Sequence, residues 1–250
     1  MNNIPIARIL ERFDRLMAQK DHAGAEQHLN NWLREAEDCG DSRGKLSVMN
    51  EQIGFYRRTG QEQPGLAVSS AAVALARELR LDGTVTMGTT LVNAATAYKS
   101  FGKADEAIVL YAEAKEIYEA RMAPTDARLG GLYNNMALAL ADLSRYDEAE
   151  TMYRKALELM GHIPHGEGEM AITWCNLADL AAAKYGMVDG EKLICQCLDK
   201  AQTLLDTDTL PGDHHYAFVC ENCAPTFGYY GYFIAEQTLR ARAKEIYERA

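Results

Sequence analysis

Apolar and small residues recur along the chain at spacings of three and four, the periodicity of an amphipathic α-helix. In the segment that begins near Ala104, one face carries Ala107, Ile108, Tyr111, Ala114, Ile117 and Tyr118. The preceding segment, from Leu91 to Tyr98, is rich in small residues that permit close helix packing, and Gly102 follows it in a position suited to a left-handed helix end. The pattern predicts two helices joined by a tight turn.

This helix pair repeats itself 42 residues later. The residues that recur are Asn93, Ala95, Asp105-Glu106-Ala107, Tyr111 and Ala114, which return as Asn135, Ala137, Asp147-Glu148-Ala149, Tyr153 and Ala156. A repeat period of roughly 20 to 50 residues is typical of solenoid proteins. The sequence therefore predicts a stack of similar helix pairs.

The repeat extends in both directions. Tyr56, Gly60, Gly65 and Ala72 precede their counterparts by 42 residues, Trp174 to Ala178 opens a later pair, and the final helix from Ala241 resembles Ala112 to Glu119. Turn-forming residues lie between the pairs, at 39–41, 81–83, 123–125, 161–168 and 207–213. We expect an all-α fold of about six antiparallel helix pairs in a single domain, with units at 4–39, 43–81, 84–122, 126–161, 167–206 and 213–250.

The pattern resembles the tetratricopeptide repeat. The small residue early in the first helix of that repeat is matched by Ala95, Ala137 and Ala178, and the bulky opener by Leu91, Tyr133 and Trp174. The small residue after Asp-Glu is matched by Ala107 and Ala149, and less well by Gly190. The long period is similar to the variety found in kinesin light chains and bacterial peptide-sensing regulators. The resemblance implies a right-handed superhelical solenoid whose first helices line a concave wall.

Composition narrows the classes of partner and the expected location. The 250 residues carry a net charge of −10 without a basic block, which disfavours nucleic acid and anionic membrane surfaces. No window has the uninterrupted apolar length of a membrane span, and the N-terminal segment is amphipathic rather than a signal peptide. Six cysteines in a chain of this size are expected to be free thiols. We expect a cytoplasmic protein.

The candidate ligand-binding residues are first the asparagines Asn93, Asn135 and Asn176, which recur near the small alanine of each first helix. The asparagine side chain has both a donor and an acceptor, so a ladder of asparagines can hold an extended peptide backbone. The resemblance supports this role, because such an asparagine commonly holds peptide in the family. The alternative is that these side chains bond only across adjacent helices or meet solvent.

Charged residues on the same expected wall would set selectivity. Arg57, Arg58 and Lys99 form a possible basic end for a peptide carboxylate, and Phe55, Asp142 and Asp179 are further candidates. The alternative is an ordinary solvated surface near the turns.

Other chemistry is weakly indicated. Cys220 and Cys223 share a helix face near His214, but a single CxxC is a poor zinc signal. Five aromatics in residues 227–233 could form a pocket, a dimer patch or terminal core, and His162 and His165 fit a polar loop. No phosphate-binding loop, HExxH pair or GxSxG elbow occurs, so we predict no cofactor, no metal and no enzymatic activity.

The predicted function is non-catalytic binding of a protein or extended peptide on the concave face. One alternative is a peptide- or small-molecule-sensing receptor that acts through a partner protein, since the repeats begin almost at Met1 and leave no room for a DNA-binding domain. Another is a self-assembling structural protein. A homodimer through the C-terminal helices is a further possibility.

Overall fold

The computed structural model describes residues 3–207 and 210–249, and helices are the only regular elements over that part of the chain. The helices are α1 (Ile6–Ala18), α2 (His22–Asp38), α3 (Ser42–Arg58), α4 (Glu62–Glu78), α5 (Val85–Ser100), α6 (Ala104–Arg121), α7 (Ala127–Asp142), α8 (Tyr146–Met160), α9 (Glu167–Asp189), α10 (Glu191–Leu205), α11 (His214–Tyr229) and α12 (Phe233–Arg249). The all-α fold of six helix pairs predicted from the sequence is confirmed.

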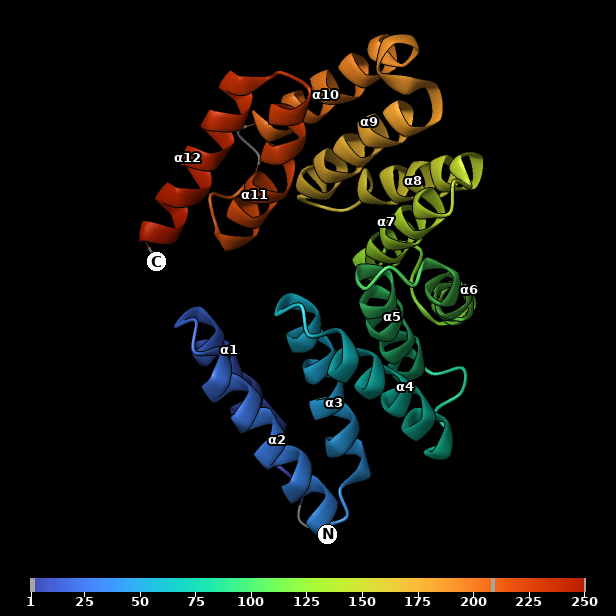
Figure 1. The fold of residues 1–250 in the computed structure, drawn as a ribbon, viewed down its shortest axis with the longest axis vertical. Helices are drawn as coiled ribbons and strands as arrows, with labels where there is room; N and C mark the ends of the chain where they lie inside the picture. The colour runs from blue at the N-terminus through green and yellow to red at the C-terminus, as the bar shows by residue number, and fades with distance from the viewer. Residues whose placement is uncertain (1–2, 208–209, 250) are drawn as a thin grey trace. The chain divides into compact units, whose positions relative to one another are not determined.

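The chain divides into two compact units, Met1–Met122 with α1 to α6 and Ala123–Ala250 with α7 to α12. Within each unit, every odd-numbered helix packs against the helix that follows it, as Figure 1 shows. In unit 1, α2 also contacts α3, and α4 contacts α5; in unit 2, α8 contacts α9, and α11 contacts α9. Each unit is therefore a stack of three helix pairs.

Tight turns connect the two helices of a pair. Gly60 and Gly102 end α3 and α5 with φ angles of 69° and 73°, as the sequence predicted for Gly102, and Ser144 occupies the corresponding left-handed position after α7 with φ 57°. Aspartate side chains begin several helices: Asp41 accepts a hydrogen bond from the Gly44 amide at 2.9 Å. The last connection between pairs includes residues 208–209, and the expected sixth unit ends at 250; these positions lie outside the described residues.

The core of unit 1 is built from the predicted small and aromatic positions. Ala95, Ala107 and Ala114 are fully buried, and Tyr111 is 1% exposed between α5 and α6. Phe55 is also buried, with its ring 6.3 Å from the ring of Phe13. The expectation that Phe55 lines a binding wall is therefore wrong, because this side chain faces the core.

Unit 2 repeats this packing with one change at the turn between α9 and α10. Ala137, Ala149 and Ala178 are fully buried. Gly186 has φ 79°, which interrupts helical geometry inside the α9 range. A Cβ atom on Gly190 would lie 2.6 Å from the Gly186 carbonyl oxygen, so only glycine fits this close approach.

Across the part of the chain that is described, none of the helices combines the length and apolar character required to cross a membrane.

Candidate binding site

The first helices of neighbouring pairs lie side by side in unit 1, and a hydrogen-bonded asparagine pair links them. Asn93 on α5 donates from Nδ2 to Oδ1 of Asn50 on α3 at 2.8 Å. Asn50 in turn donates to the Thr90 hydroxyl at 3.1 Å and to the Leu46 carbonyl at 3.0 Å. Both asparagines are half-buried. We call the surface formed by α3 and α5 around this pair the first-helix face of unit 1.

A second asparagine pair occupies the same place in unit 2. Asn176 on α9 donates from Nδ2 to Oδ1 of Asn134 on α7 at 3.2 Å. The sequence repeat had selected the adjacent Asn135, which is half-buried and makes no side-chain hydrogen bond within the described residues. We call the surface formed by α7, α9 and α11 the first-helix face of unit 2.

These bonds show that Asn93 and Asn176 do join adjacent helices, as the structural alternative foresaw. They do not use the full capacity of the side chains. A carboxamide offers two N–H donors and a carbonyl oxygen, and the single bond of Asn93 or Asn176 occupies one donor. Since these residues are only half-buried, the remaining groups can meet solvent or a ligand.

The three basic candidates of unit 1 lie at the C-terminal ends of α3 and α5. Burial, together with the nearby charge of Arg58, lowers the pKa of Arg57, and Tyr111 is close enough to oppose this shift. The Arg58 guanidinium lies 5.7 Å from the centre of the Phe13 ring, and Lys99 is half-buried. Arg57 and Arg58 are exposed and thus available to an anionic group.

The acidic candidates of unit 2 lie around a buried tyrosine. Burial raises the pKa of Tyr153, and the charges of Asp179 and Asp142 raise it further. Tyr230 on α11 donates its hydroxyl hydrogen to Oδ1 of Asp179 at 3.0 Å. Although part of Asp179 is open to solvent, its surroundings are dry enough that burial raises the pKa of its carboxyl.

Asp179 stands in a groove between α9 and α11 with a volume of about 610 Å³. Its floor and walls come from small and apolar side chains of the two helices. We call this the Asp179 groove; its lining residues are Asp179, Ala182, Ala183, Met187, Pro225, Thr226, Tyr229 and Tyr230. The sequence did not reveal this groove, since its two sides are separated by nearly 40 residues and meet only through helix packing.

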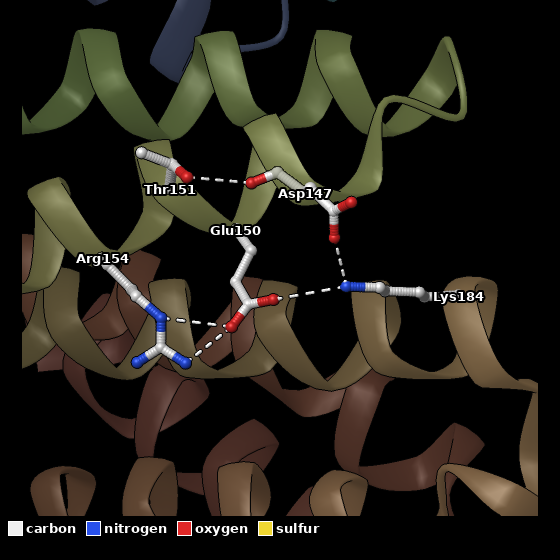
Figure 2. Close-up of polar contacts among 5 residues, drawn as sticks. All are labelled: Asp147, Glu150, Thr151, Arg154 and Lys184. Carbon is white, nitrogen blue, oxygen red and sulfur yellow. Dashed lines mark hydrogen bonds and ion pairs between the residues drawn. The ribbon is translucent and has the colours of Figure 1, made fainter.

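Lys184, one turn beyond Asp179 on α9, is held away from the groove lining by an ion-pair network with α8. Figure 2 shows its ammonium group between Asp147 and Glu150, at 2.5 Å and 3.6 Å from their carboxylate oxygens. Glu150 also accepts two hydrogen bonds from Arg154, at 3.1 Å and 2.6 Å. The bond to Asp147 raises the pKa of Lys184, so this lysine stays charged while joining the second and third helices of unit 2.

The other sequence candidates have packing roles. Cys220 and Cys223 are fully buried, and a hydrogen bond with Cys175 raises the pKa of Cys223 along with burial. Among the residues the structure describes, no three His, Cys, Asp or Glu side chains are grouped to hold a metal ion. His162 and His165 are exposed in the loop after α8.

The aromatic run at 227–233 has two parts. Phe227 is fully buried in the terminal core, whereas Tyr229 and Phe233 are 73% and 62% exposed. Tyr229 faces the Asp179 groove, and Phe233 lines a separate cavity of about 470 Å³ beside α10 and α12. The homodimer through the C-terminal helices stays a prediction.

Comparison with known proteins identifies the repeat. Residues 88–122 and 130–160 match the sequence profile of the tetratricopeptide repeat. The chain is a tetratricopeptide-repeat protein. The two matched segments correspond to α5 with α6 and to α7 with α8, the pairs that carry the clearest repeat in the sequence.

Solved structures share the fold over most of the chain. A putative kinesin light chain from Podosopora anserina with nearly identical repeats has 15% identity and a TM-score of 0.59, covering 82% of this chain and 95% of that one. BtubC (BKLC) from P. vanneervenii has 20% identity and a TM-score of 0.58, covering 92% and 90%. NprR in complex with its cognate peptide NprX has 17% identity and a TM-score of 0.60, covering 96% and 66%. No curated protein matches the chain in sequence.

Proposed function

We propose that this tetratricopeptide-repeat protein binds an extended protein segment or peptide on its first-helix faces, without catalytic turnover. The observation that carries the proposal is the pair of half-buried asparagines in each unit, Asn50 with Asn93 and Asn134 with Asn176, which retain donors and acceptors beyond their mutual bonds. Peptide backbone presents repeated N–H and C=O groups that match such carboxamides.

The similarity to a peptide complex supports the same class of ligand. NprR, which shares the fold across 96% of this chain, was solved with its cognate peptide. Fold similarity alone does not transfer a ligand. It does agree with the polar first-helix faces, which offer backbone-binding groups on a rigid helical support.

Charged residues beside the asparagines would select among ligands. In unit 1, Arg57, Arg58 and Lys99 are proposed to attract carboxylates, since arginine can bind a carboxylate through two parallel hydrogen bonds. In unit 2, Asp142 and Asp179 supply the opposite charge. Asn135 remains a candidate contact on the first-helix face of unit 2. The cytoplasmic location stays part of this proposal and agrees with the six free cysteines.

The experiment is a selection of random twelve-residue peptides by display, followed by fluorescence anisotropy with an enriched peptide. The variants are the double substitution Asn50→Ala with Asn93→Ala, and the double substitution Asn134→Ala with Asn176→Ala. We expect at least one of them to weaken binding about tenfold or more, because each lost hydrogen bond contributes about 0.5–1.5 kcal/mol.

Asn31→Ala is the matched control, because Asn31 is an exposed asparagine on α2, the second helix of its pair. This variant should bind like the original protein. Each double variant should also retain most of its stability, since the broken bonds are partly buried. Failure to enrich any peptide, or equal affinity for all three variants, would contradict the proposed function.

A further inference from the structure

The Asp179 groove combines one carboxylate with an otherwise uncharged lining. Tyr229 is 73% exposed and Met187 is 50% exposed, so the groove presents apolar surface beside the carboxylate. The remaining lining side chains are small or neutral, including Ala183, Pro225 and Tyr230. A ligand that fills this space must therefore satisfy one negative charge and cover apolar area.

The negative charge has no cationic partner in the described structure. The hydrogen bond that Asp179 accepts comes from the neutral hydroxyl of Tyr230. Lys184, the nearest basic residue along α9, is engaged by Asp147 and Glu150 on the α8 side (Figure 2). Asp142 on α7 adds a second negative charge to the surroundings of Tyr153, which also lies within reach of Asp179. The local field favours a positive ligand group.

We propose that the Asp179 groove binds a lysine or arginine side chain of a peptide, with an apolar residue of the same peptide packing beside it. This inference rests on the proposed function, because it assumes that the first-helix faces bind peptide, and it adds the class of side chain selected in unit 2. The carboxylate of Asp179 would accept charge-assisted hydrogen bonds from the cation.

The tyrosines add to this selectivity. The rings of Tyr229 and Tyr230 lie 5.0 Å apart at an interplanar angle of 85°, and both line the groove. Aromatic rings attract cations through their quadrupole and also supply apolar contact area. Charge complementarity and aromatic lining thus point to the same ligand, a basic side chain with an apolar neighbour.

The test is a positional-scanning peptide array in which one central position is fixed to each amino acid and its neighbours are randomised. Bound protein is measured for the original chain, Asp179→Asn and Asp179→Lys. The original chain should favour lysine and arginine at the fixed position. Asp179→Asn should reduce that preference about 10- to 100-fold, as expected for loss of a hydrogen-bonded charge. Asp179→Lys should shift the preference to aspartate and glutamate.

Asp189→Asn is the control, because it removes the same charge from an exposed position on α9 outside the groove lining. The asparagine at 179 can still accept the Tyr230 hydrogen bond, and equal melting temperatures would show that the fold is kept. Peptide binding without a basic preference, or a preference that survives Asp179→Asn, would overturn this inference while leaving the proposed function intact. Absence of binding to every peptide would overturn both.

Discussion

At the scale of single residues, the asparagines show what a repeat pattern can and cannot predict. The spacing of 42 residues selected Asn93, Asn135 and Asn176, and two of these take part in the hydrogen-bonded pairs. Their partners, Asn50 and Asn134, were not predicted. Asn50 lies 43 residues before Asn93, one residue out of the register set by Gly60 and Gly102. One residue turns a helix position by about 100°, so a sequence alignment cannot choose between adjacent asparagines.

The cysteines give a prediction at the same scale. Cys39 and Cys195 are half-buried, whereas Cys175, Cys197, Cys220 and Cys223 are buried. Burial raises the pKa of Cys197 to about 11, so about one thiol in a thousand is ionised at pH 8. With iodoacetamide at that pH, Cys39 and Cys195 should be modified first, and the buried four only after unfolding, as followed by peptide mass spectrometry. Modification of Cys197 in the native protein as fast as Cys39 would show that this packing is wrong.

At the scale of helices, the small residues of the pattern were the most predictable feature. Ala95 and Ala137 are fully buried at the contact between paired helices, as expected from their recurrence. Gly190 is a weak match in sequence, yet it serves the same close approach, because its missing side chain leaves room for the Gly186 carbonyl group. The left-handed Gly186 could not be assigned from the pattern, since the repeat alignment placed no turn glycine there.

Two glycines in unit 1 test the packing of its helices. A Cβ atom on Gly88 of α5 would lie 2.5 Å from the ring of Tyr118 on α6, whereas one on Gly54 of α3 would meet nothing within 4 Å. Gly88→Ala should lower the free energy of unfolding by about 1–3 kcal/mol through overpacking. Gly54→Ala should raise it by about 0.5–1 kcal/mol, because alanine favours the helix. Urea denaturation measures both; equal effects of the two substitutions would contradict the observed α5–α6 contact.

At the scale of the whole molecule, period and helix pattern together were sufficient for the fold class and for the number of helix pairs. The description of the chain as one domain stays a prediction beside its two compact units. The charged candidates were visible in sequence, but their settings were not. Asp179 and Tyr230 are 51 residues apart, and only the packing of α9 against α11 brings them into one groove. Long-range packing of this kind leaves no periodic signal.

The most direct test of the central claim is to locate a bound peptide on the chain. A peptide enriched by display would carry a photoreactive benzophenone side chain, and mass spectrometry would identify the residues to which it crosslinks. We predict crosslinks on the first helices, α3 and α5 in unit 1 or α7, α9 and α11 in unit 2, reduced when the asparagine pair beside them is replaced by alanine. Crosslinks confined to the second helices, α4, α6, α8 or α10, would contradict the account.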